Sequence, residues 1–285
     1  MPKPRKKDFL AASLSANLEN CGPEDICKVA IDVFRPVKIF VGFSGGFDSL
    51  VGAHWSMNNV PNCEVFHANT GIGIEKTREF VRETCRVNNW PLTEIRAKED
   101  CNQDYDEIVK EQGFPGPAMH SRMFQRLKER AVRELLRRNK TKRSDNVMLL
   151  TGIRKDESVR RSGYKYSLLA FTGNILWVNA FYYKEKSWFS SYIRQNDLQQ
   201  NPVSEILGMS GECLCGAYAH KGEKDLIKIV CPETFSRIEN LEKQVKERGF
   251  AWGWEDAPPR QKKCKKTNDL FMPFCVGCEK VENGQ

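Results

Sequence analysis

The sequence predicts a doubly wound, mostly parallel α/β sheet followed by a smaller, cysteine-bearing C-terminal region. Two observations favour this fold class. Short runs rich in β-branched and aromatic residues alternate with helix-like segments, and the polar motifs follow directly after the strand-like runs. In doubly wound sheets ligands bind beyond the carboxyl ends of the strands, so the placement of the motifs agrees with the same fold.

Four segments are expected to be buried strands because they are short, largely apolar and bounded by turn residues. They are residues 37–43, 63–69, 92–97 and 146–153. After about Lys184 the alternation weakens into shorter helices and loops that carry the later cysteines.

Helices are expected between these strands. One runs from about Asp48 to Asn58, and another covers residues 75–89 and ends before Pro91. In a third, residues 121–139, the apolar side chains share one face, so the helix should dock on the core and turn its arginines outward. Its apolar residues are Phe124, Leu127, Ala131 and Leu135.

The chain of 285 residues is long enough for one large domain with an appendage. We expect an N-terminal helical extension over residues 1–36, a nucleotide-binding α/β domain over 37–184, and a C-terminal helical and loop region over 185–285. No apolar run approaches the roughly 20 residues that span a bilayer, and the basic N-terminus lacks the apolar core of a secretory signal. These features predict a cytoplasmic protein without a membrane interaction.

Part of the net charge is concentrated in one helix. The formal net charge is +8, from 45 basic and 37 acidic residues. From His120 to Arg143 there are ten Lys and Arg side chains against two glutamates, Glu129 and Glu134. A helix of this kind, residues 121–143, can neutralise phosphates, so a nucleic-acid acceptor is one expectation. An amphipathic surface helix rich in arginine is the alternative.

The stretch SGGFDS after the first strand has the properties of a phosphate-binding loop. Gly45 and Gly46 let the backbone curl close to an anion, and the N–H groups of the next helix point at it. Ser44 and Ser49 add hydroxyl donors, and Asp48 can hold Mg²⁺ or cap the helix. The missing lysine argues against a Walker A loop. The simpler alternative is a Gly-Gly turn capped by serine and aspartate.

Three further segments follow in order: HANTGIGIEKTREFV (67–81), TGIRKDESVRRS (151–162) and the longer segment 186–216. Together with SGGFDS they resemble the phosphoadenosine phosphosulfate (PAPS) reductase family, with its DndC-like and CysH-like members, of the PP-loop (N-type) ATP pyrophosphatase superfamily. The first resembles that family's Asp-Thr-Gly segment and Thr-initiated helix, the second its arginine loop. The third resembles its Trp-containing helix, Asn-Pro turn and cysteine-bearing segment. The resemblance covers residues 37–216 and implies an adenine nucleotide α-hydrolase-like fold.

The resemblance implies an adenosine nucleotide, ATP or PAPS, bound with Mg²⁺. The nucleotide would be held by residues of three loops: Ser44, Gly45, Gly46, Asp48, Ser49, Asn69, Thr70, Gly71, Gly152, Arg154 and Ser158. The catalytic groups would be Asp48, Arg154, Arg160 and Arg161. A guanidinium can neutralise a phosphate or sulfate bidentately and stabilise charge that develops during transfer. A solvated charged turn is the alternative, and Asn69 stands where the family has Asp.

Eleven cysteines, six of them from Cys213 onwards, are many for a chain in a reducing compartment. The spacings in GECLCG and CVGC suggest one site formed by four thiols, those of Cys213, Cys215, Cys275 and Cys278. Superfamily members that insert sulfur into nucleic acids imply a [4Fe–4S] cluster there, with Zn²⁺ as the alternative. Buried or unligated thiols are the simpler interpretation. Cys231 and Cys264 are spare candidates for a ligand or a sulfur-relay thiol.

The sequence departs from a sulfite-forming reductase at two points. It lacks that family's C-terminal Glu-Cys-Gly-x-His motif, and GPAMHSRMFQRLKERA, before the arginine loop, lacks the Cys-Cys pair of the iron–sulfur members. His120, Arg122 and Lys128 stand in that stretch and are candidates to face the substrate.

The resemblance therefore favours an ATP pyrophosphatase-type sulfurtransferase that adenylylates an acceptor, such as a nucleic acid, and releases pyrophosphate. Two alternatives remain open: a PAPS or adenosine phosphosulfate reductase that forms sulfite, and a non-catalytic nucleotide-binding accessory of a phage- or CRISPR-type system. A sulfur-donor protein is an expected partner, and a homo-oligomer is left open.

Overall fold

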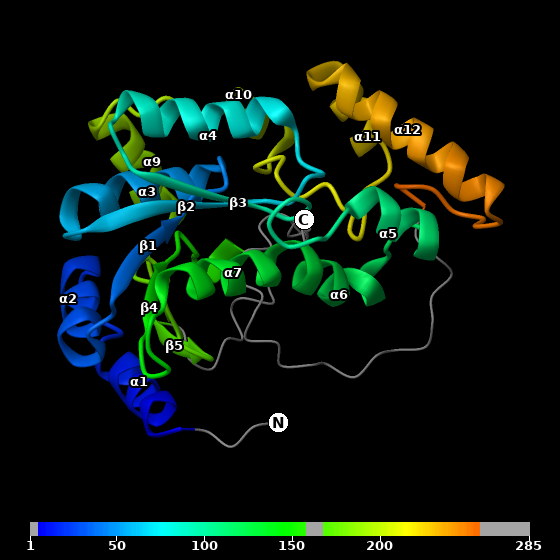
Figure 1. Cartoon of the computed structure of the whole chain (residues 1–285). Coiled ribbons are helices and arrows are strands. Elements are labelled where there is room, and N and C mark those ends of the chain that lie inside the picture. Colours follow the sequence, from blue (N-terminus) through cyan, green and yellow to red (C-terminus); the bar gives the residue numbers. More distant parts are fainter. Residues whose placement is uncertain (1–4, 158–167, 257–285) are drawn as a thin grey trace.

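The computed structural model describes residues 5–157 and 168–256, and its centre is a six-stranded sheet between helices (Figure 1). The strands are β1 (Lys38–Gly42), β2 (Cys63–Asn69), β3 (Leu92–Arg96), β4 (Val147–Leu150), β5 (Leu169–Thr172) and β6 (Ile175–Val178). Their order across the sheet is β3-β2-β1-β4-β6-β5, and every neighbouring pair is parallel except β5 with β6. The predicted fold class, a doubly wound and mostly parallel sheet, is confirmed.

All four strands predicted from the sequence form. The fourth ends at Leu150 rather than at residue 153, because residues 151–154 leave the sheet and pack on the helix that follows β1. The hairpin of β5 and β6 was not predicted. Its turn is Gly173-Asn174, with Gly173 in the left-handed region at φ +59°, and this pair between two apolar runs is a hairpin signal that the sequence contained.

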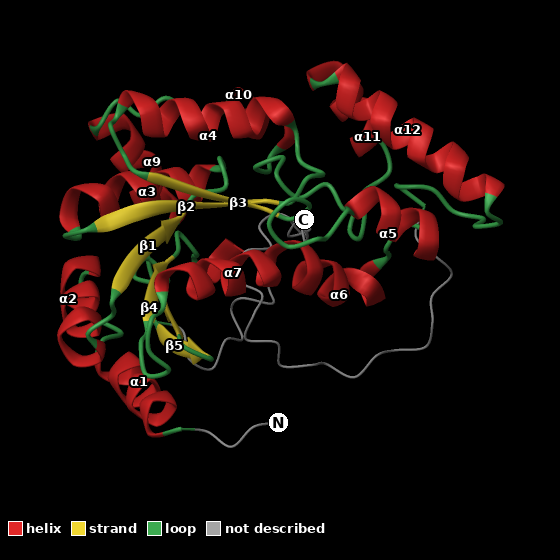
Figure 2. Ribbon diagram, viewed as in Figure 1, coloured by secondary structure: helices red, strands yellow, loops and turns green. Residues whose placement is uncertain are grey.

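Helices cover both faces of the sheet (Figure 2). Successive residues of β1 point to opposite faces, so Val41 packs with one layer and Phe40 with the other. The first layer contains α3 (Phe47–Asn59), α4 (Glu75–Val87) and α9 (Lys186–Gln195), and the second contains α7 (Arg130–Asn139). At the far edge α1 (Lys6–Asn17) contacts β5 and α2 (Pro23–Phe34) contacts β6.

A second hydrophobic core lies beyond the carboxyl ends of β2 and β3, since Ile72, Ile74 and Ala97 belong to it. Its helices are α5 (Tyr105–Gln112), α10 (Pro202–Leu207), α11 (Glu223–Val230) and α12 (Pro232–Glu247). Leu214 and Cys215 are buried in the same core. The cysteine-bearing segment is therefore attached to the edge of the sheet at which ligands of this fold class bind.

The predicted helix over residues 121–139 is present but has a π-turn in its middle. It consists of α6 (His120–Phe124), the π-turn Gln125–Glu129 and α7. Three successive side chains, those of Leu127, Lys128 and Glu129, are all buried, which the apolar stripe of a regular surface helix does not produce. In a regular helix Lys128 would lie on the same stripe as Phe124 and Leu127, whereas Glu129 would turn to the surface. The wider turn thus brings Glu129 into the interior as well, where it pairs with Arg133.

None of the helices in the described ranges is both long enough and apolar enough to cross a bilayer. Two short 3₁₀ turns, η1 (Pro117–Met119) and η3 (Lys155–Glu157), complete the described elements.

The exit of β4 passes very close to the first turn of α3. A Cβ atom built on Gly152 would lie 2.3 Å from the Asp48 carbonyl oxygen, and one on Gly52 would lie 3.1 Å from the Gly152 Cα. Since both obstacles are backbone atoms, neither can move aside without shifting a helix or a strand. Glycine at position 152 is therefore required by packing, whatever else it contacts.

We expect Gly152→Ala to lower the free energy of unfolding by about 2–3 kcal/mol, because the added methyl group forces two backbones apart. Urea denaturation measures this loss. Gly22→Ala is the matched control, because a Cβ atom at Gly22 meets nothing within 4 Å, and it should change stability by less than about 0.5 kcal/mol. Equal effects of the two substitutions would contradict the close approach.

Candidate nucleotide site

The chain connections diverge between β1 and β4. From β1 the chain continues to β2 and β3 on one side, whereas β4, β6 and β5 lie on the other. Such a switch point leaves a crevice beyond the carboxyl ends of the two central strands, which is where open α/β sheets bind ligands. The segments that follow these two strands are residues 43–46 and 151–154.

The predicted phosphate loop has the geometry of a helix-capping anion loop. Gly45 adopts φ +77°, and Gly46 is the N-cap of the 13-residue helix α3. Ser49 Oγ donates to the Gly46 carbonyl at 2.9 Å, accepts from the Ser44 N–H at 3.2 Å and lies 3.1 Å from Ser44 Oγ. The two hydroxyls and the free N–H groups of the first turn of α3 therefore meet at one point, where the helix dipole favours an anion.

Two side chains from other motifs hold this loop in place. Asn201 Nδ2 donates to the Gly45 carbonyl at 3.0 Å and to Thr77 Oγ1 at 3.2 Å. Thr77 Oγ1 in turn donates to the Ser210 carbonyl at 2.8 Å, and a Cβ atom on Gly45 would lie 2.7 Å from Thr77 Cγ2. The Thr-initiated helix and the Asn-Pro turn, which the sequence analysis noted without assigning roles, are thus supports of the phosphate loop.

Asp48 and Arg154, both predicted to be catalytic, form an ion pair with each other. Arg154 Nε donates to Asp48 Oδ1 at 2.9 Å and Nη2 donates to Oδ2 at 3.1 Å, and both residues are more than nine-tenths buried. The Arg154 guanidinium also lies 5.4 Å from the centre of the Phe189 ring. Each carboxylate oxygen accepts one hydrogen bond from Arg154 and keeps a second lone pair, so Asp48 could coordinate Mg²⁺ beside Arg154 or in exchange for it.

The other predicted arginine-loop residues, Ser158, Arg160 and Arg161, lie outside the described residues. Gly152 lies at the close contact with Asp48 described above.

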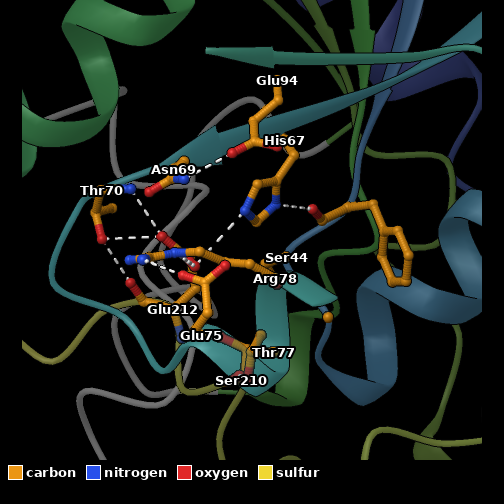
Figure 3. A network of polar contacts seen from close by, with 12 residues as sticks. Ser44, His67, Asn69, Thr70, Glu75, Thr77, Arg78, Glu94, Ser210 and Glu212 are labelled. Atoms are coloured by element: carbon orange, nitrogen blue, oxygen red, sulfur yellow. Dashed lines mark hydrogen bonds and ion pairs between the residues drawn. The ribbon is translucent and has the colours of Figure 1, made fainter. Parts of the chain in front are cut away.

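At the end of β2, Asn69 uses both ends of its amide within the protein (Figure 3). Its Nδ2 donates to Glu94 Oε1 at 2.6 Å, and its Oδ1 accepts from the Gly71 N–H at 3.0 Å. Arg82 donates to both oxygens of Glu94 at 2.9 Å. Burial raises the pKa of Glu94, but the hydrogen bonds from Arg82 and Asn69 more than offset it and lower the pKa to about 2. An Asp in place of Asn69 would set two carboxylates against each other, which explains this departure from the family pattern.

Thr70 is bound to Glu212, a residue the sequence analysis did not single out (Figure 3). Glu212 Oε1 accepts from the Thr70 N–H at 2.7 Å, Oε2 accepts from Arg78 Nε at 3.3 Å and lies 3.6 Å from His67 Nε2. His67 Nδ1 donates to the Phe43 carbonyl at 2.8 Å. The His67 ring therefore lies between the backbone at Phe43 and the Glu212 carboxylate, with Nε2 just beyond hydrogen-bond distance of the carboxylate.

Glu212 keeps its charge although it is only 1% exposed. Burial raises its pKa, but His67, Arg78 and the Thr70 N–H together outweigh burial, so the pKa of Glu212 lies below its ordinary value. The next residue, Cys213, is a predicted metal ligand, and the motif GECLCG was singled out for its cysteines alone. Nothing in the sequence indicates that the glutamate beside Cys213 is buried.

Cys213 and Cys215 line one small cavity together with His120 and Lys128. Met123, Phe124 and Leu127 complete its wall. Tyr105 Oη donates to the Cys215 carbonyl at 2.9 Å and Trp254 Nε1 donates to the Leu214 carbonyl at 2.8 Å, so the loop backbone is fixed on both sides of the second cysteine. The structure thus brings together two of the predicted metal ligands and two of the three residues proposed to face the substrate.

The metal prediction is only partly accessible to the structure. Cys275 and Cys278, like the spare candidate Cys264, lie outside the described residues. Within the described ranges, no group of three or more His, Cys, Asp and Glu side chains is arranged to hold a metal. Two thiols in one cavity suit a soft metal centre, so Cys213 and Cys215 fit as half of a four-thiolate site. The other spare candidate, Cys231, lies 3.0 Å from Thr234 Oγ1 at the start of α12.

Several arginines of the basic helix are paired within the protein. Arg133 binds Glu129, Arg137 binds Glu134, and Arg138 binds Glu134 and Asp100. These pairs reduce the positive charge that α7 presents to a partner. A nucleic-acid acceptor on residues 121–143 therefore stays a prediction.

A glycine-rich anion loop without a lysine, placed at the switch point of a mostly parallel sheet, defines a nucleotide-binding α/β protein of the PP-loop class. Residues 38–205, more than half of the chain, match the phosphoadenosine phosphosulfate reductase domain family. The chain belongs to this family, and so to a group of nucleotide-using proteins of sulfur chemistry. The family suggested by the sequence motifs is confirmed.

The chain is also similar to individual proteins. It is 24% identical over 250 residues to an uncharacterized protein of Methanocaldococcus jannaschii, covering 80% of this chain but only about half (54%) of that protein's length. PAPS reductase from Candida auris, solved as a phosphate complex, superposes with a TM-score of 0.52 at 16% identity over 73% of this chain and 94% of that one. NH3-dependent NAD synthetase from Campylobacter jejuni gives a TM-score of 0.45 at 15% identity, covering 84% and 97% of the two chains. The reductase likeness supports the fold alone.

We expect Arg154→Met to cost about 3–5 kcal/mol of unfolding free energy, because it leaves the Asp48 carboxylate buried and unpaired. The double variant Asp48→Asn/Arg154→Met should lose less than the sum of the single losses. A double-mutant cycle from urea denaturation measures this coupling. Additive losses would show that the two side chains do not depend on each other.

Asn69→Asp should destabilise the protein by about 2–3 kcal/mol at pH 7, because a donated hydrogen bond becomes a contact between carboxylates. The stability that Glu94 contributes is complete above its ordinary pKa of 4.5 and is lost as the pH falls through about 2. The penalty of the substitution should therefore shrink towards pH 4, where the new carboxyl can be protonated.

Thermal unfolding of both proteins between pH 4 and pH 8 tests this sign. Adding Glu94→Gln to the variant is the control, since it removes one of the two opposed charges and should recover part of the loss at pH 7. A penalty that does not change with pH would contradict the assigned contact.

Proposed function

We propose that the protein is an ATP-dependent sulfurtransferase that binds its nucleotide at residues 44–49 and carries out the sulfur step at the cysteine loop, residues 210–216. The observation that carries this proposal is the hydrogen-bonded connection between the two loops. Asn201 binds the Gly45 carbonyl, Thr77 binds the Ser210 carbonyl, and the two side chains bind each other, so a phosphate loop and a thiol-bearing loop are joined through these supports.

In the first step an oxygen of the acceptor would attack the α-phosphorus of ATP, and pyrophosphate would leave. The N–H groups at the start of α3 and the hydroxyls of Ser44 and Ser49, which lie together, would bind the phosphate oxygens as charge develops on them. Arg154 would add a cation once it exchanges the Asp48 carboxylate for phosphate, and Asp48 would then be available for Mg²⁺.

In the second step the outer sulfur of a persulfide on Cys213 or Cys215, supplied by a donor protein, would form a bond to the acceptor carbon, and AMP would leave with the former acceptor oxygen. The other thiol of the pair would then attack the inner sulfur, which breaks the S–S bond, releases the acceptor as a thiolate and joins the two cysteines in a disulfide. An external thiol reductant would reduce that disulfide before the next turnover. A [4Fe–4S] cluster, if bound, would supply sulfide or electrons there, held by these two cysteines with Cys275 and Cys278; Zn²⁺ is the alternative occupant.

The acceptor would be a nucleic acid if the cations of residues 121–143 that are not paired within the protein bind phosphates. In this proposal the α/β part, residues 37–184, holds the nucleotide, and residues 185–285 carry the sulfur chemistry. Of the N-terminal extension, residues 1–36, the described part contacts the sheet at its far edge through α1 and α2.

A sulfite-forming reductase of PAPS or adenosine phosphosulfate is the second candidate, and membership of the PAPS reductase family favours it. The same loops would hold a sulfonucleotide, with its sulfate in place of the outer phosphates of ATP. No Glu-Cys-Gly-x-His motif, the cysteine motif of the assimilatory reductases, occurs within these 285 residues, and we therefore place this activity second.

Nucleotide binding separates the two candidates. ATP with Mg²⁺ should raise the melting temperature, and at a hundred times its Kd it should add about 2.7 kcal/mol of stability. Ser44→Ala/Ser49→Ala should weaken ATP about tenfold, because both hydroxyl donors are lost. Ser56→Ala on the same helix is the matched control, since its buried hydroxyl has no hydrogen-bond partner among the described residues, and it should leave the Kd unchanged.

Calorimetry with ATP and with PAPS gives the deciding comparison. ATP binding followed by release of AMP and pyrophosphate supports sulfur transfer. Binding of PAPS alone, with sulfite released in the presence of thioredoxin, replaces it with the reductase. If neither nucleotide binds, both assignments are wrong.

A further inference from the structure

We propose that Glu212 is a positioning residue that couples nucleotide binding at residues 44–49 to the backbone of the cysteine loop, residues 210–216. The inference rests on the proposed function only in taking an adenosine nucleotide as the ligand. Among the predicted nucleotide-binding residues Glu212 contacts Thr70, whose N–H and hydroxyl both bind it, so its role would be exerted through other residues.

The first step concerns the free energy that burial of the Glu212 carboxylate costs. Glu212 is almost completely buried, and a buried charge destabilises the fold unless several partners satisfy it. Its partners, Thr70, Arg78 and His67, come from the end of β2 and from the first turn of α4 (Figure 3). An apolar side chain at position 212 would satisfy the packing of residues 210–216 by themselves. The charge of Glu212 therefore serves the contacts of this loop with β2 and α4.

The second step concerns the segments that the partners of Glu212 contact in turn. His67 donates to the carbonyl of Phe43, the residue before the phosphate loop, and Thr70 stands in the segment expected to contact the nucleotide. Glu212 is thus linked through His67 to the backbone at Phe43, which enters the phosphate loop, and directly to Thr70 at the end of β2. Any shift of Phe43 or Thr70 on nucleotide binding changes the surroundings of this carboxylate.

The third step is the second connection between the same two loops. Gly45 is joined to Ser210 through Asn201 and Thr77, and the Ile74 N–H donates to the Gly211 carbonyl at 2.9 Å. Three successive residues of the cysteine loop, 210 to 212, are therefore bound to α4, β2 and the segment between them. The chain has no room to relax there, since a Cβ atom on Gly73 would lie 2.8 Å from the Glu212 Cα.

The fourth step is the position of Glu212 in the chain. The next residue is Cys213, which lines the cavity with Cys215, His120 and Lys128. Because the loop is held at residue 212 on one side and at the Leu214 carbonyl by Trp254 on the other, Cys213 is the residue between two fixed points. Movement of the carboxylate would therefore be transmitted to Cys213 before any other side chain of the cavity.

Hydrogen–deuterium exchange of the full chain, read by mass spectrometry, tests this coupling without relying on the state of the thiols. In the wild-type protein, ATP with Mg²⁺, or PAPS if only PAPS binds, should slow exchange both at residues 43–52 and, by about threefold or more, at residues 210–216. In Glu212→Gln the nucleotide should still protect residues 43–52, with a Kd within about threefold of wild type, but the protection of the cysteine loop should disappear.

Glu223→Gln is the matched control. Glu223 is also a buried glutamate of the C-terminal region, but its carboxylate accepts from the His220 N–H and has no described contact with β2 or α4, so this variant should keep both effects of the nucleotide. Arg78→Gln is a second test, because it removes a partner of the carboxylate from outside the loop and should abolish the same transmitted protection. It keeps the test valid if Glu212→Gln does not fold.

The outcomes are distinguishable from a failure of the proposed function. If the wild-type protein binds neither nucleotide, the proposed function is wrong. If a nucleotide protects residues 43–52 but not the cysteine loop, or if the loop protection survives in Glu212→Gln or Arg78→Gln, the coupling is wrong while the nucleotide site stands. A merely structural role for Glu212 would raise exchange of the loop equally with and without nucleotide, which would also overturn the coupling.

Discussion

Where β4 leaves the sheet, the backbone at Gly152 passes so close to Asp48 that only a hydrogen atom fits between them. Parallel pairing of β1 with β4 makes this contact possible, because it brings both carboxyl ends to one edge of the sheet. The contact fixes the first turn of α3, and with it the anion-binding N–H groups, against the loop that carries Arg154. The phosphate loop, its ion pair and the supports from α4 all depend on this approach of two backbones.

The site balances its own buried charges before any ligand arrives. Asp48 is neutralised by Arg154, Glu94 by Arg82, and Glu212 by Arg78 with His67. This follows from the cost of leaving a charge unpaired in the interior. Among the described residues these three arginines therefore already have carboxylate partners, and a polyphosphate that bound Arg154 would share it with Asp48 or replace Asp48. The Asp48–Arg154 pair is the described ion pair next to the phosphate loop.

Much of the fold and of the phosphate loop could be predicted from the sequence, because these depend on local pattern: apolar runs give the strands, and glycines with serines give the loop. The charge network could not be predicted, because Glu212 and its partner Thr70 are 142 residues apart in the chain. The π-turn escaped for a related reason, since its residues follow a helical pattern and only the burial of Glu129 distinguishes it. The Thr77 and Asn201 motifs were visible, but their shared contact with Gly45 required the folded chain.

The π-turn also shapes the surroundings of Cys213 and Cys215. In a regular helix Lys128 would share the stripe of Phe124 and Leu127, whereas Glu129 would turn to the surface. The wider turn buries Glu129 as well, and a buried carboxylate needs a partner, which Arg133 supplies. The same helical segment provides five of the side chains that line the cavity with the two cysteines: His120, Met123, Phe124, Leu127 and Lys128. The environment of any group held by Cys213 and Cys215 is thus set by one continuous stretch of helix whose register the π-turn changes.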